Sequence, residues 1–183
     1  MSSLAERLVA IHESLSAAGL PHAIGGAIAY GFCVPEPRGT RDLDVNIFVT
    51  PDRAAEAFAA LPAEVARPSA SVERAERDGQ VRLWWADTPI DVFLNSLPFH
   101  DAVAKNIRHV PFAGRRIPVL GCTDLAVFKA MFGRPRDWVD IEAMVAAGRI
   151  EIDVATGWLQ AMESLDAAQR MLRLAVAGGG VNG

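Results

Sequence analysis

The sequence has few cysteines and no long apolar run, and each of these two shortages argues against a class of protein. Cys33 and Cys122 are the only cysteines in 183 residues, which is too few for a disulfide framework. We therefore expect free thiols in a reducing cytoplasm. No run reaches the roughly 18 apolar residues that a membrane-spanning helix needs, so we expect no membrane contact. The first residues carry Glu6 and Glu13 at helical periodicity, and we expect no signal peptide there.

Histidines are also few, and the net charge is small. The four histidines show no zinc-ligand spacing, which argues against a His/Cys zinc site. A net charge of −4 does not favour indiscriminate binding to nucleic acid. Arginine nevertheless supplies every basic group except Lys105 and Lys129, and arginines gather in residues 67–82 and at Arg115 and Arg116. Such local clusters are suited to binding phosphates.

Apolar residues are abundant, at 51% of the chain, and their spacing predicts the secondary structure. Strands are predicted just before Gly25 and over residues 43–49, 80–86, 89–95, 107–112 and 116–120. Helices are predicted over residues 4–15, after Gly26, and over residues 52–61, 123–132, 137–147 and 153–175. Residues 64–79 are predicted to be a loop or an edge strand. Strands dominate the first two thirds and helices the last, so we expect an α/β core followed by a helical cap.

Two acids stand where a loop turns into an apolar strand, in the stretch RGTRDLDVNIFV. Strand alternation places Asp42 and Asp44 on one face, opposite the apolar side chains. Two adjacent carboxylates repel each other, and a divalent cation removes that cost. Because hard oxygen ligands prevail and histidines are few, Mg²⁺ or Mn²⁺ is favoured over zinc. The alternative is that both acids are solvated, or are paired with Arg38 and Arg41.

A third acid and a glycine pair extend this pattern. Asp91 interrupts an otherwise apolar strand, and by itself it could be a charged residue that protects a sheet edge. If its strand lies beside that of Asp44, three carboxylates converge, which suits a two-metal phosphoryl-transfer site. Gly25 and Gly26 lie between a strand and a helix, where backbone N–H groups can approach a phosphate, although most such pairs only form turns.

Together these residues resemble the nucleotidyltransferase superfamily with the DNA polymerase β-like fold. Its pattern is a Gly-Gly or Gly-Ser turn, a helix, Asp-x-Asp on the next strand and a later third Asp. The chain reads IGGAIAYGF, RGTRDLDVNIFV and PIDVF in that order. The form R-x-T-x-D-x-D and the later DLAVFKAMFGRPRDWVDI are most similar to the AbiEii/MenT-type toxin nucleotidyltransferases. Two departures are Gly26, where that branch often has serine, and a chain shorter than many members.

The resemblance implies a fold, a domain organisation and a set of site residues. The implied fold is α+β, with a mixed-sheet catalytic core over residues 1–120 and a helical part over 121–177 packed on the core. The glycine-rich end of the sequence predicts a flexible tail over residues 178–183. The implied catalytic residues are Asp42, Asp44, Asp91 and Lys129, with Mg²⁺ or Mn²⁺ held by the three aspartates. The implied nucleotide-binding residues are Gly25, Gly26, Arg38, Thr40, Lys129 and Asp140.

Lys129 also stands out within its own predicted helix, which Thr123 is placed to cap and Gly133 to end. Lys129 falls inside the apolar stripe of that helix. It is predicted either to face a phosphate or to lay its stem on apolar neighbours while its ammonium reaches water. Asp137 is predicted to cap the next helix, one turn before Asp140.

Three functions are compatible with these patterns. The first is metal-dependent transfer of a nucleoside monophosphate from an NTP to an acceptor hydroxyl, by a toxin that acts on RNA such as tRNA and has an antitoxin protein as its partner. The second is adenylylation of a small aminoglycoside- or lincosamide-type antibiotic, which would need an acidic cleft. The third is non-catalytic nucleotide binding, against which three intact acids argue. We expect the first, because the arginine clusters favour a polyanionic acceptor.

Overall fold

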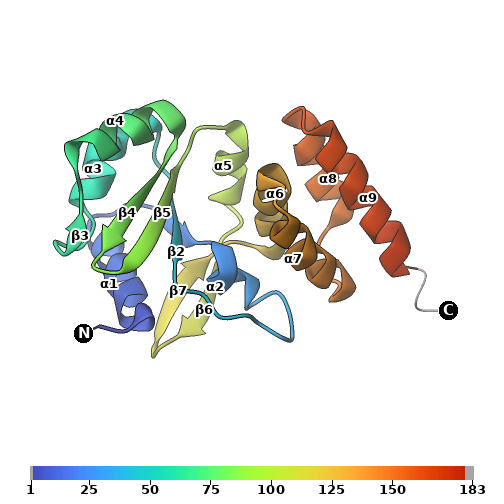
Figure 1. Cartoon of the computed structure of the whole chain (residues 1–183), viewed down its shortest axis with the longest axis horizontal. Helices are drawn as coiled ribbons and strands as arrows, with labels where there is room; N and C mark the ends of the chain where they lie inside the picture. Colours follow the sequence, from blue (N-terminus) through green and yellow to red (C-terminus); the bar gives the residue numbers. More distant parts are fainter. Residues whose placement is uncertain (1, 180–183) are drawn as a thin grey trace. The chain divides into compact units, whose positions relative to one another are not determined.

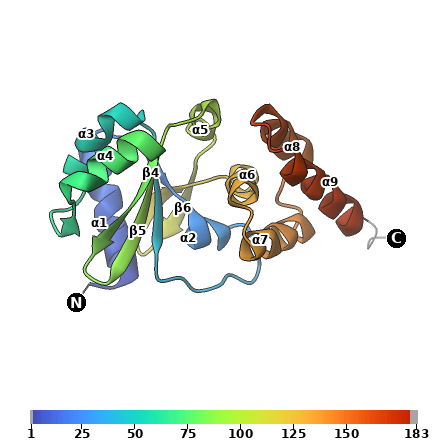
Figure 2. The ribbon, with the colours of Figure 1, turned by 45° about the horizontal axis from the view of Figure 1, so that its top comes forward.

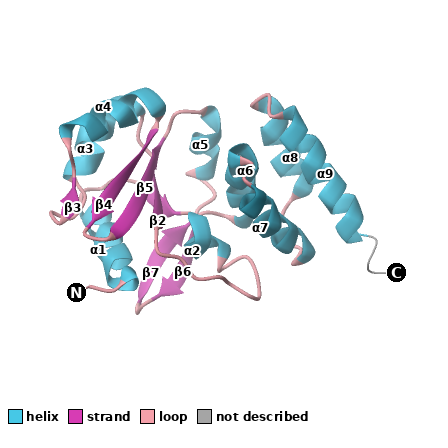
Figure 3. Cartoon of the chain, in the orientation of Figure 1, coloured by secondary structure: helices cyan, strands magenta, loops and turns pink. Residues whose placement is uncertain are grey.

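The computed structural model describes residues 2–179, so the tail predicted for residues 178–183 lies outside the described residues from residue 180 onward. The chain divides into two compact units. The sheet unit comprises Met1–Ile28 and Gly39–Leu120, and the helical unit comprises Ala29–Arg38 and Gly121–Gly183. The architecture is α+β, with a mixed sheet, flanking helices and C-terminal helices, as predicted (Figure 1; Figure 3). Within residues 2–179, no helix combines the length and the apolar character needed to cross a bilayer.

A seven-stranded sheet forms the core of the sheet unit, in the order β3-β4-β5-β2-β1-β7-β6. The strands are β1 (His22–Ile24), β2 (Leu43–Ile47), β3 (Val65–Ala66), β4 (Gln80–Trp85), β5 (Thr88–Leu94), β6 (Arg108–Phe112) and β7 (Arg115–Val119). β2 runs parallel to β5 and antiparallel to β1, whereas β4 pairs antiparallel with β5. The sheet therefore brings β2 and β5 side by side although they are distant in the sequence (Figure 1).

Alternation along the two central strands separates an apolar face of the sheet from a polar one. The fully buried residues of β2 and β5 are Leu43, Val45, Ile47, Ile90, Val92 and Leu94. Asp44 and Asp91 alternate with them and are only partly buried. Because successive side chains of a strand point to opposite faces, the two aspartates lie on the face away from this apolar layer.

In its described residues the sheet unit contains five α-helices: α1 (Leu4–Ala17), α2 (Gly26–Tyr30), α3 (Ala54–Ala59), α4 (Ser69–Asp78) and α5 (Pro98–Val103). Helix α2 continues into the helical unit, and a short 3-10 helix, η1 (Pro51–Arg53), precedes α3.

The prediction of a loop or edge strand over residues 64–79 is wrong for most of that segment. Within that segment only β3 (Val65–Ala66) is an edge strand, and residues 69–78 form α4, which packs on β4. The buried residues of α4 are only Ser71 and Ala75, so this helix shows no apolar stripe that could identify it.

Four helices follow in the helical unit: α6 (Cys122–Phe132), α7 (Pro135–Ala146), α8 (Ile152–Ala161) and α9 (Leu165–Gly179). The single helix predicted over residues 153–175 is wrong, because the chain turns between α8 and α9, with Glu163 at a φ of 60°. The two helices pack against each other (Figure 2). Gly133 ends α6 as predicted, at a φ of 66°. Thr123 does not cap α6; its hydroxyl accepts the backbone N–H of Glu151 at 3.0 Å.

Cys33 and Cys122 form a disulfide, so the expectation of free thiols is wrong. Their Cα atoms are 5.7 Å apart, although 89 positions separate them in the sequence. The bond joins the segment 29–38 to the first turn of α6, both within the helical unit. No local pattern indicated the pairing, because it depends on which distant segments the fold brings together.

Candidate active site

Three acids, Asp42, Asp44 and Asp91, form an acidic row on the polar face of the sheet. Asp44 and Asp91 lie directly opposite each other on the parallel strands β2 and β5. Asp91 in turn lies opposite Arg82 of the antiparallel strand β4. Asp42 precedes β2 by one residue and shares the face of Asp44 by alternation. The condition for convergence, that the strand of Asp91 lies beside that of Asp44, is thus met.

Arg82 was not predicted as a site residue, yet it contacts the acidic row directly. Its Nε and Nη2 donate to Oδ1 and Oδ2 of Asp91 at 2.8 Å and 2.7 Å. The Arg82 side chain is 51% exposed and that of Asp91 is 21% exposed. The hydrogen bond to Asp91 raises the pKa of Arg82 above its ordinary value, and the negative charges of Asp42 and Asp44 raise it further. One guanidinium therefore interacts with all three carboxylates.

The glycine pair is required by the close approach of the backbone to Asp44. Gly26 has a φ of 54°, and a Cβ at this position would overlap the Asp44 carboxylate. Gly25 donates its N–H to the backbone carbonyl of Asp44 at 2.8 Å. A Cβ on Gly25 would lie 3.0 Å from Nδ2 of Asn46. The turn thus places bare backbone beside the acidic row, as a phosphate-binding turn needs.

Asn46 is a second residue that sequence reasoning missed. It lies two residues after Asp44 in β2, on the same face, and is 3% exposed. Its Oδ1 is buried without a hydrogen-bond partner among residues 2–179. An unsatisfied buried acceptor costs about 1–3 kcal/mol, so this oxygen is suited to a donor or cation brought by a ligand. Strand alternation from Asp44 was the signal that could have found it.

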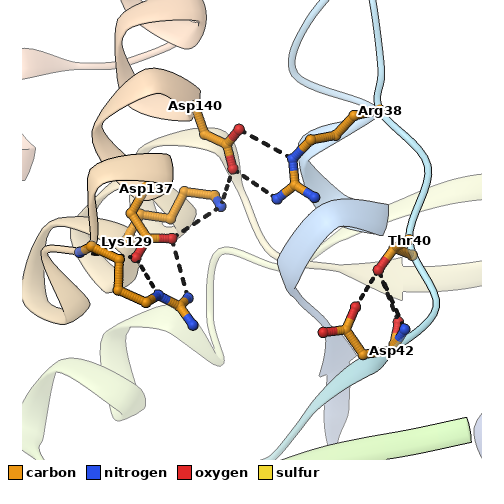
Figure 4. Close-up of polar contacts among 7 residues, drawn as sticks. Arg38, Thr40, Asp42, Lys129, Asp137 and Asp140 are labelled. Atoms are coloured by element: carbon orange, nitrogen blue, oxygen red, sulfur yellow. Dashed lines mark hydrogen bonds and ion pairs between the residues drawn. The ribbon is translucent and has the colours of Figure 1, made fainter.

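Thr40 orients the first acid of the row. Its hydroxyl donates to a carboxylate oxygen of Asp42, and the Asp42 backbone N–H lies 3.4 Å from the same hydroxyl (Figure 4). Thr40 was predicted to bind nucleotide, and that role stays a prediction. Its contact in the structure is with Asp42.

The residues of this face suit a divalent cation in donor type. The carboxylates of the acidic row and the amide oxygen of Asn46 are the hard oxygen ligands that Mg²⁺ and Mn²⁺ prefer. Arg82 shows that the row attracts a positive charge. These side chains are not gathered into a closed ligand set: within the part of the chain that the structure describes, no group of at least three His, Cys, Asp or Glu residues could hold a metal ion.

A second charged cluster lies in the helical unit (Figure 4). Asp140 accepts hydrogen bonds from Nε and Nη2 of Arg38 at 3.2 Å and 2.9 Å, and from Nζ of Lys129 at 2.6 Å. Lys129 Nζ also lies 3.7 Å from Oδ1 of Asp137. Asp137 is not the N-cap of α7 as predicted, because that position is held by Arg134. From inside the first turn, Asp137 accepts the Arg134 backbone N–H at 3.2 Å and satisfies a donor at the start of the helix.

This second cluster is buried, with Lys129, Asp137 and Asp140 exposed by only 5%, 1% and 2%. Burial acts to raise the pKa of Asp140, but the hydrogen bonds and charges of Arg38 and Lys129 outweigh it and hold that pKa below its ordinary value. The Lys129 side chain is only 7% exposed and its ammonium pairs with Asp140, which argues against the alternative of a snorkelling lysine. Its anionic partners are carboxylates of the chain, and the predicted phosphate contact is still a prediction.

The predicted site residues are thus divided between the two units. The sheet unit holds Gly25, Gly26, Thr40, Asp42, Asp44 and Asp91. The helical unit holds Arg38, Lys129 and Asp140. Each group is brought together within its own unit.

No protein-family model and no curated protein sequence matches the chain. Solved structures do resemble it. The crystal structure of an antigenic nucleotidyltransferase-like protein from Paracoccidioides brasiliensis is 17% identical, with a TM-score of 0.52 over 92% of this chain and 93% of that one. The solution structure of the antibiotic-resistance factor ANT(2'')-Ia is 16% identical, with a TM-score of 0.50 over 94% and 89% of the two chains. The fold is therefore that of nucleotidyltransferase-like proteins.

Proposed function

We propose that the chain is a metal-dependent nucleotidyltransferase, which transfers a nucleoside monophosphate from an NTP to an acceptor hydroxyl. The observation that carries this proposal is the position of Asp44 directly opposite Asp91 on adjacent parallel strands. Asp42 on the same face and the bare backbone of Gly26 beside Asp44 add to it. The likeness of the fold to nucleotidyltransferase-like proteins supports the same class.

In this proposal Asp42, Asp44 and Asp91 would hold Mg²⁺ or Mn²⁺, and Asp91 would also help to accept the proton of the acceptor hydroxyl. The hydroxyl oxygen forms a bond to the α-phosphorus, the bond from that phosphorus to the β-phosphate oxygen breaks, and pyrophosphate leaves. When bound, the ion neutralises phosphate charge and polarises the reacting oxygens. Gly25 and Gly26 let the phosphates approach the backbone. Positioning and charge stabilisation supply most of the rate enhancement.

The motif also assigns Arg38, Lys129 and Asp140 to nucleotide binding. Lys129 is already paired with Asp140, so a phosphate would compete with a carboxylate for its ammonium. We retain this assignment as part of the proposal. It is tested by Lys129→Met beside Lys105→Met, which removes the other lysine: only the first should weaken NTP binding.

For the acceptor we propose RNA, with the end of a tRNA as the target, and an antitoxin protein as the partner of a bacterial toxin. The support is the R-x-T-x-D-x-D form around Asp42 and Asp44. The arginines of residues 67–82 support an RNA acceptor less than expected, because some of them are already paired within the chain. Arg67 donates to backbone carbonyls, and Arg77 pairs with its neighbour Asp78.

A second candidate is transfer to a small hydroxylated antibiotic. The likeness to ANT(2'')-Ia, an antibiotic-resistance factor, favours it. The acidic row also presents an excess of negative charge on a partly exposed face, which would attract a cationic acceptor.

One assay separates these candidates. The protein is incubated with Mg²⁺ and each labelled NTP in turn, with total RNA in one series and with aminoglycosides and lincosamides in another. Labelled RNA supports the first acceptor, and a labelled drug supports the second. Asp44→Asn should abolish transfer, whereas Asp78→Asn, an exposed acid of the same unit, should not. Absence of transfer to every acceptor would contradict the enzyme assignment.

Thermal unfolding provides an independent test. Mg²⁺ and an NTP should raise the Tm more together than the sum of their separate shifts, because carboxylates and phosphates share the ion. Purely additive shifts would contradict a shared site. Cooperative stabilisation without any transfer would instead identify a non-catalytic nucleotide-binding module.

A further inference from the structure

Arg82 lies where the proposed reaction needs a divalent cation, so this inference rests on the proposed function. Its guanidinium engages both carboxylate oxygens of Asp91, at 2.8 Å and 2.7 Å. Asp44 is the next residue along the same line, opposite Asp91. A metal ion at Asp91 and the guanidinium would use the same oxygens, and two cations at one carboxylate repel each other.

We propose that Arg82 is a built-in counter-ion, which holds Asp91 in the metal-free protein and releases it when a divalent cation binds. The contact is suited to exchange, because the Arg82 side chain is 51% exposed and water can replace its hydrogen bonds. Lys129 of the buried cluster has no such freedom, since its side chain is only 7% exposed.

An ordinary cross-strand ion pair that only joins β4 to β5 is the competing explanation. Two features distinguish Arg82 from such a pair. Its partner Asp91 faces Asp44, and Asp42 lies on the same face, so unneutralised carboxylates would repel one another here. The pair Arg77–Asp78 has the same two-bond geometry, at 2.8 Å and 2.9 Å, and the further acid whose charge acts on Arg77 is Glu73, which is not a member of the acidic row. It therefore provides a matched control.

The inference predicts that removing Arg82 tightens metal binding. Arg82→Gln keeps a polar side chain but loses the charge, so both the competition for Asp91 and the repulsion of the ion disappear. The affinity for Mn²⁺, measured by calorimetry without nucleotide, should rise about five-fold, or about 1 kcal/mol at 1.4 kcal/mol per tenfold. Arg82→Lys keeps the charge but not the two-bond geometry, so its Mn²⁺ affinity should lie between those of the wild type and Arg82→Gln. Arg77→Gln should bind as the wild type does.

A second readout follows the guanidinium itself. In ¹⁵N spectra of the metal-free wild type, a slowly exchanging arginine Nε–H signal should be present that is absent from Arg82→Gln. Saturating Mg²⁺ should abolish the slow exchange of this signal. The corresponding signal of Arg77 should not respond, because Asp78 stands apart from the acidic row.

The outcomes separate this inference from the proposed function. Mn²⁺ binding that is lost in Asp44→Asn is taken as binding at the acidic row. If the wild type binds Mn²⁺ in an Asp44-dependent manner and Arg82→Gln binds it equally or more weakly, the role of Arg82 is overturned and the proposed function stands. If neither protein shows Asp44-dependent binding, both are overturned. Binding that appears only after Arg82 is removed supports the inference in its strongest form.

Discussion

The two units of the chain hold their acidic residues in opposite ways. In the sheet unit the acidic row lies on partly exposed positions, and an exposed arginine, Arg82, pairs with one of its members. In the helical unit Asp137 and Asp140 are almost completely buried, and Lys129 and arginines are packed against them. Chemically identical carboxylates thus occupy two contrasting environments.

Burial explains the difference and its consequence. A carboxylate removed from water needs a fixed counter-charge, because an unpaired buried charge is strongly destabilising. A partly exposed carboxylate can exchange partners, since water compensates while it does so. Of the two clusters, the acidic row can therefore exchange its counter-charge without the loss of a buried ion pair. The carboxylates of the buried cluster are paired with Lys129, Arg38 and Arg134, and removing one partner would leave a buried charge unpaired.

The largest expected effect concerns the acidic row of the sheet unit. Asp44→Asn should reduce nucleotidyl transfer by about a thousand-fold, because losing a metal ligand forfeits several kcal/mol and each 1.4 kcal/mol is tenfold. The Tm in metal-free buffer should be unchanged or slightly higher, because repulsion from Asp42 and Asp91 is relieved. Transfer assays and calorimetry measure the two effects. Wild-type rates in both Asp44→Asn and Asp42→Asn would refute the metal-binding role.

On the buried side, Lys129→Met should lower the free energy of unfolding by about 3 kcal/mol, because it leaves buried carboxylates short of a partner. Methionine retains much of the lysine stem, so packing changes little. Lys105→Met, at an exposed position, should change stability by less than about 0.5 kcal/mol. Urea denaturation measures both variants. If Lys129→Met lowers the free energy of unfolding as little as Lys105→Met does, the buried cluster does not depend on a fixed counter-charge.

Reduction of the disulfide should also act on the helical unit. Breaking the Cys33–Cys122 bond should lower the free energy of unfolding by about 2–4 kcal/mol, since the closed loop restricts the unfolded chain. Hydrogen exchange should show faster opening in the helical unit than in the sheet unit. The double variant Cys33→Ser, Cys122→Ser is the control and should not respond to reductant. A wild type equally indifferent to reductant would mean that the thiols are free in solution.

The smallest expected effect is the pH dependence of the stability that Lys129→Met loses. The folded-state pKa of Asp140 lies below its ordinary value of 3.8, so the stability it contributes is present above that value and is lost as the pH falls through the folded pKa. Lys129 is one cause of this lowering. The difference between wild type and variant should therefore be constant above about pH 5 and shrink below about pH 4, as urea midpoints would show. A pH-independent difference would assign the contribution of Lys129 to packing.

Local patterns of the sequence determined much of this protein. Helix α1, the strands β2 and β5, and the common face of Asp42 and Asp44 follow from apolar periodicity, because alternation and helical spacing act between near neighbours. The same reasoning failed where an element depends on its contacts. Helix α4 is polar and is held by packing on β4, and the turn between α8 and α9 interrupts a continuous helical pattern.

Only the tertiary structure decided which distant residues meet. The strand order places Asp91 opposite Asp44 and sets Arg82 on Asp91, and packing within the helical unit joins Arg38 to Asp140 across 102 positions. The disulfide between Cys33 and Cys122 belongs to the same class. Such contacts depend on strand pairing and burial over the whole unit. A pattern that repeats every two to four residues carries no information about them.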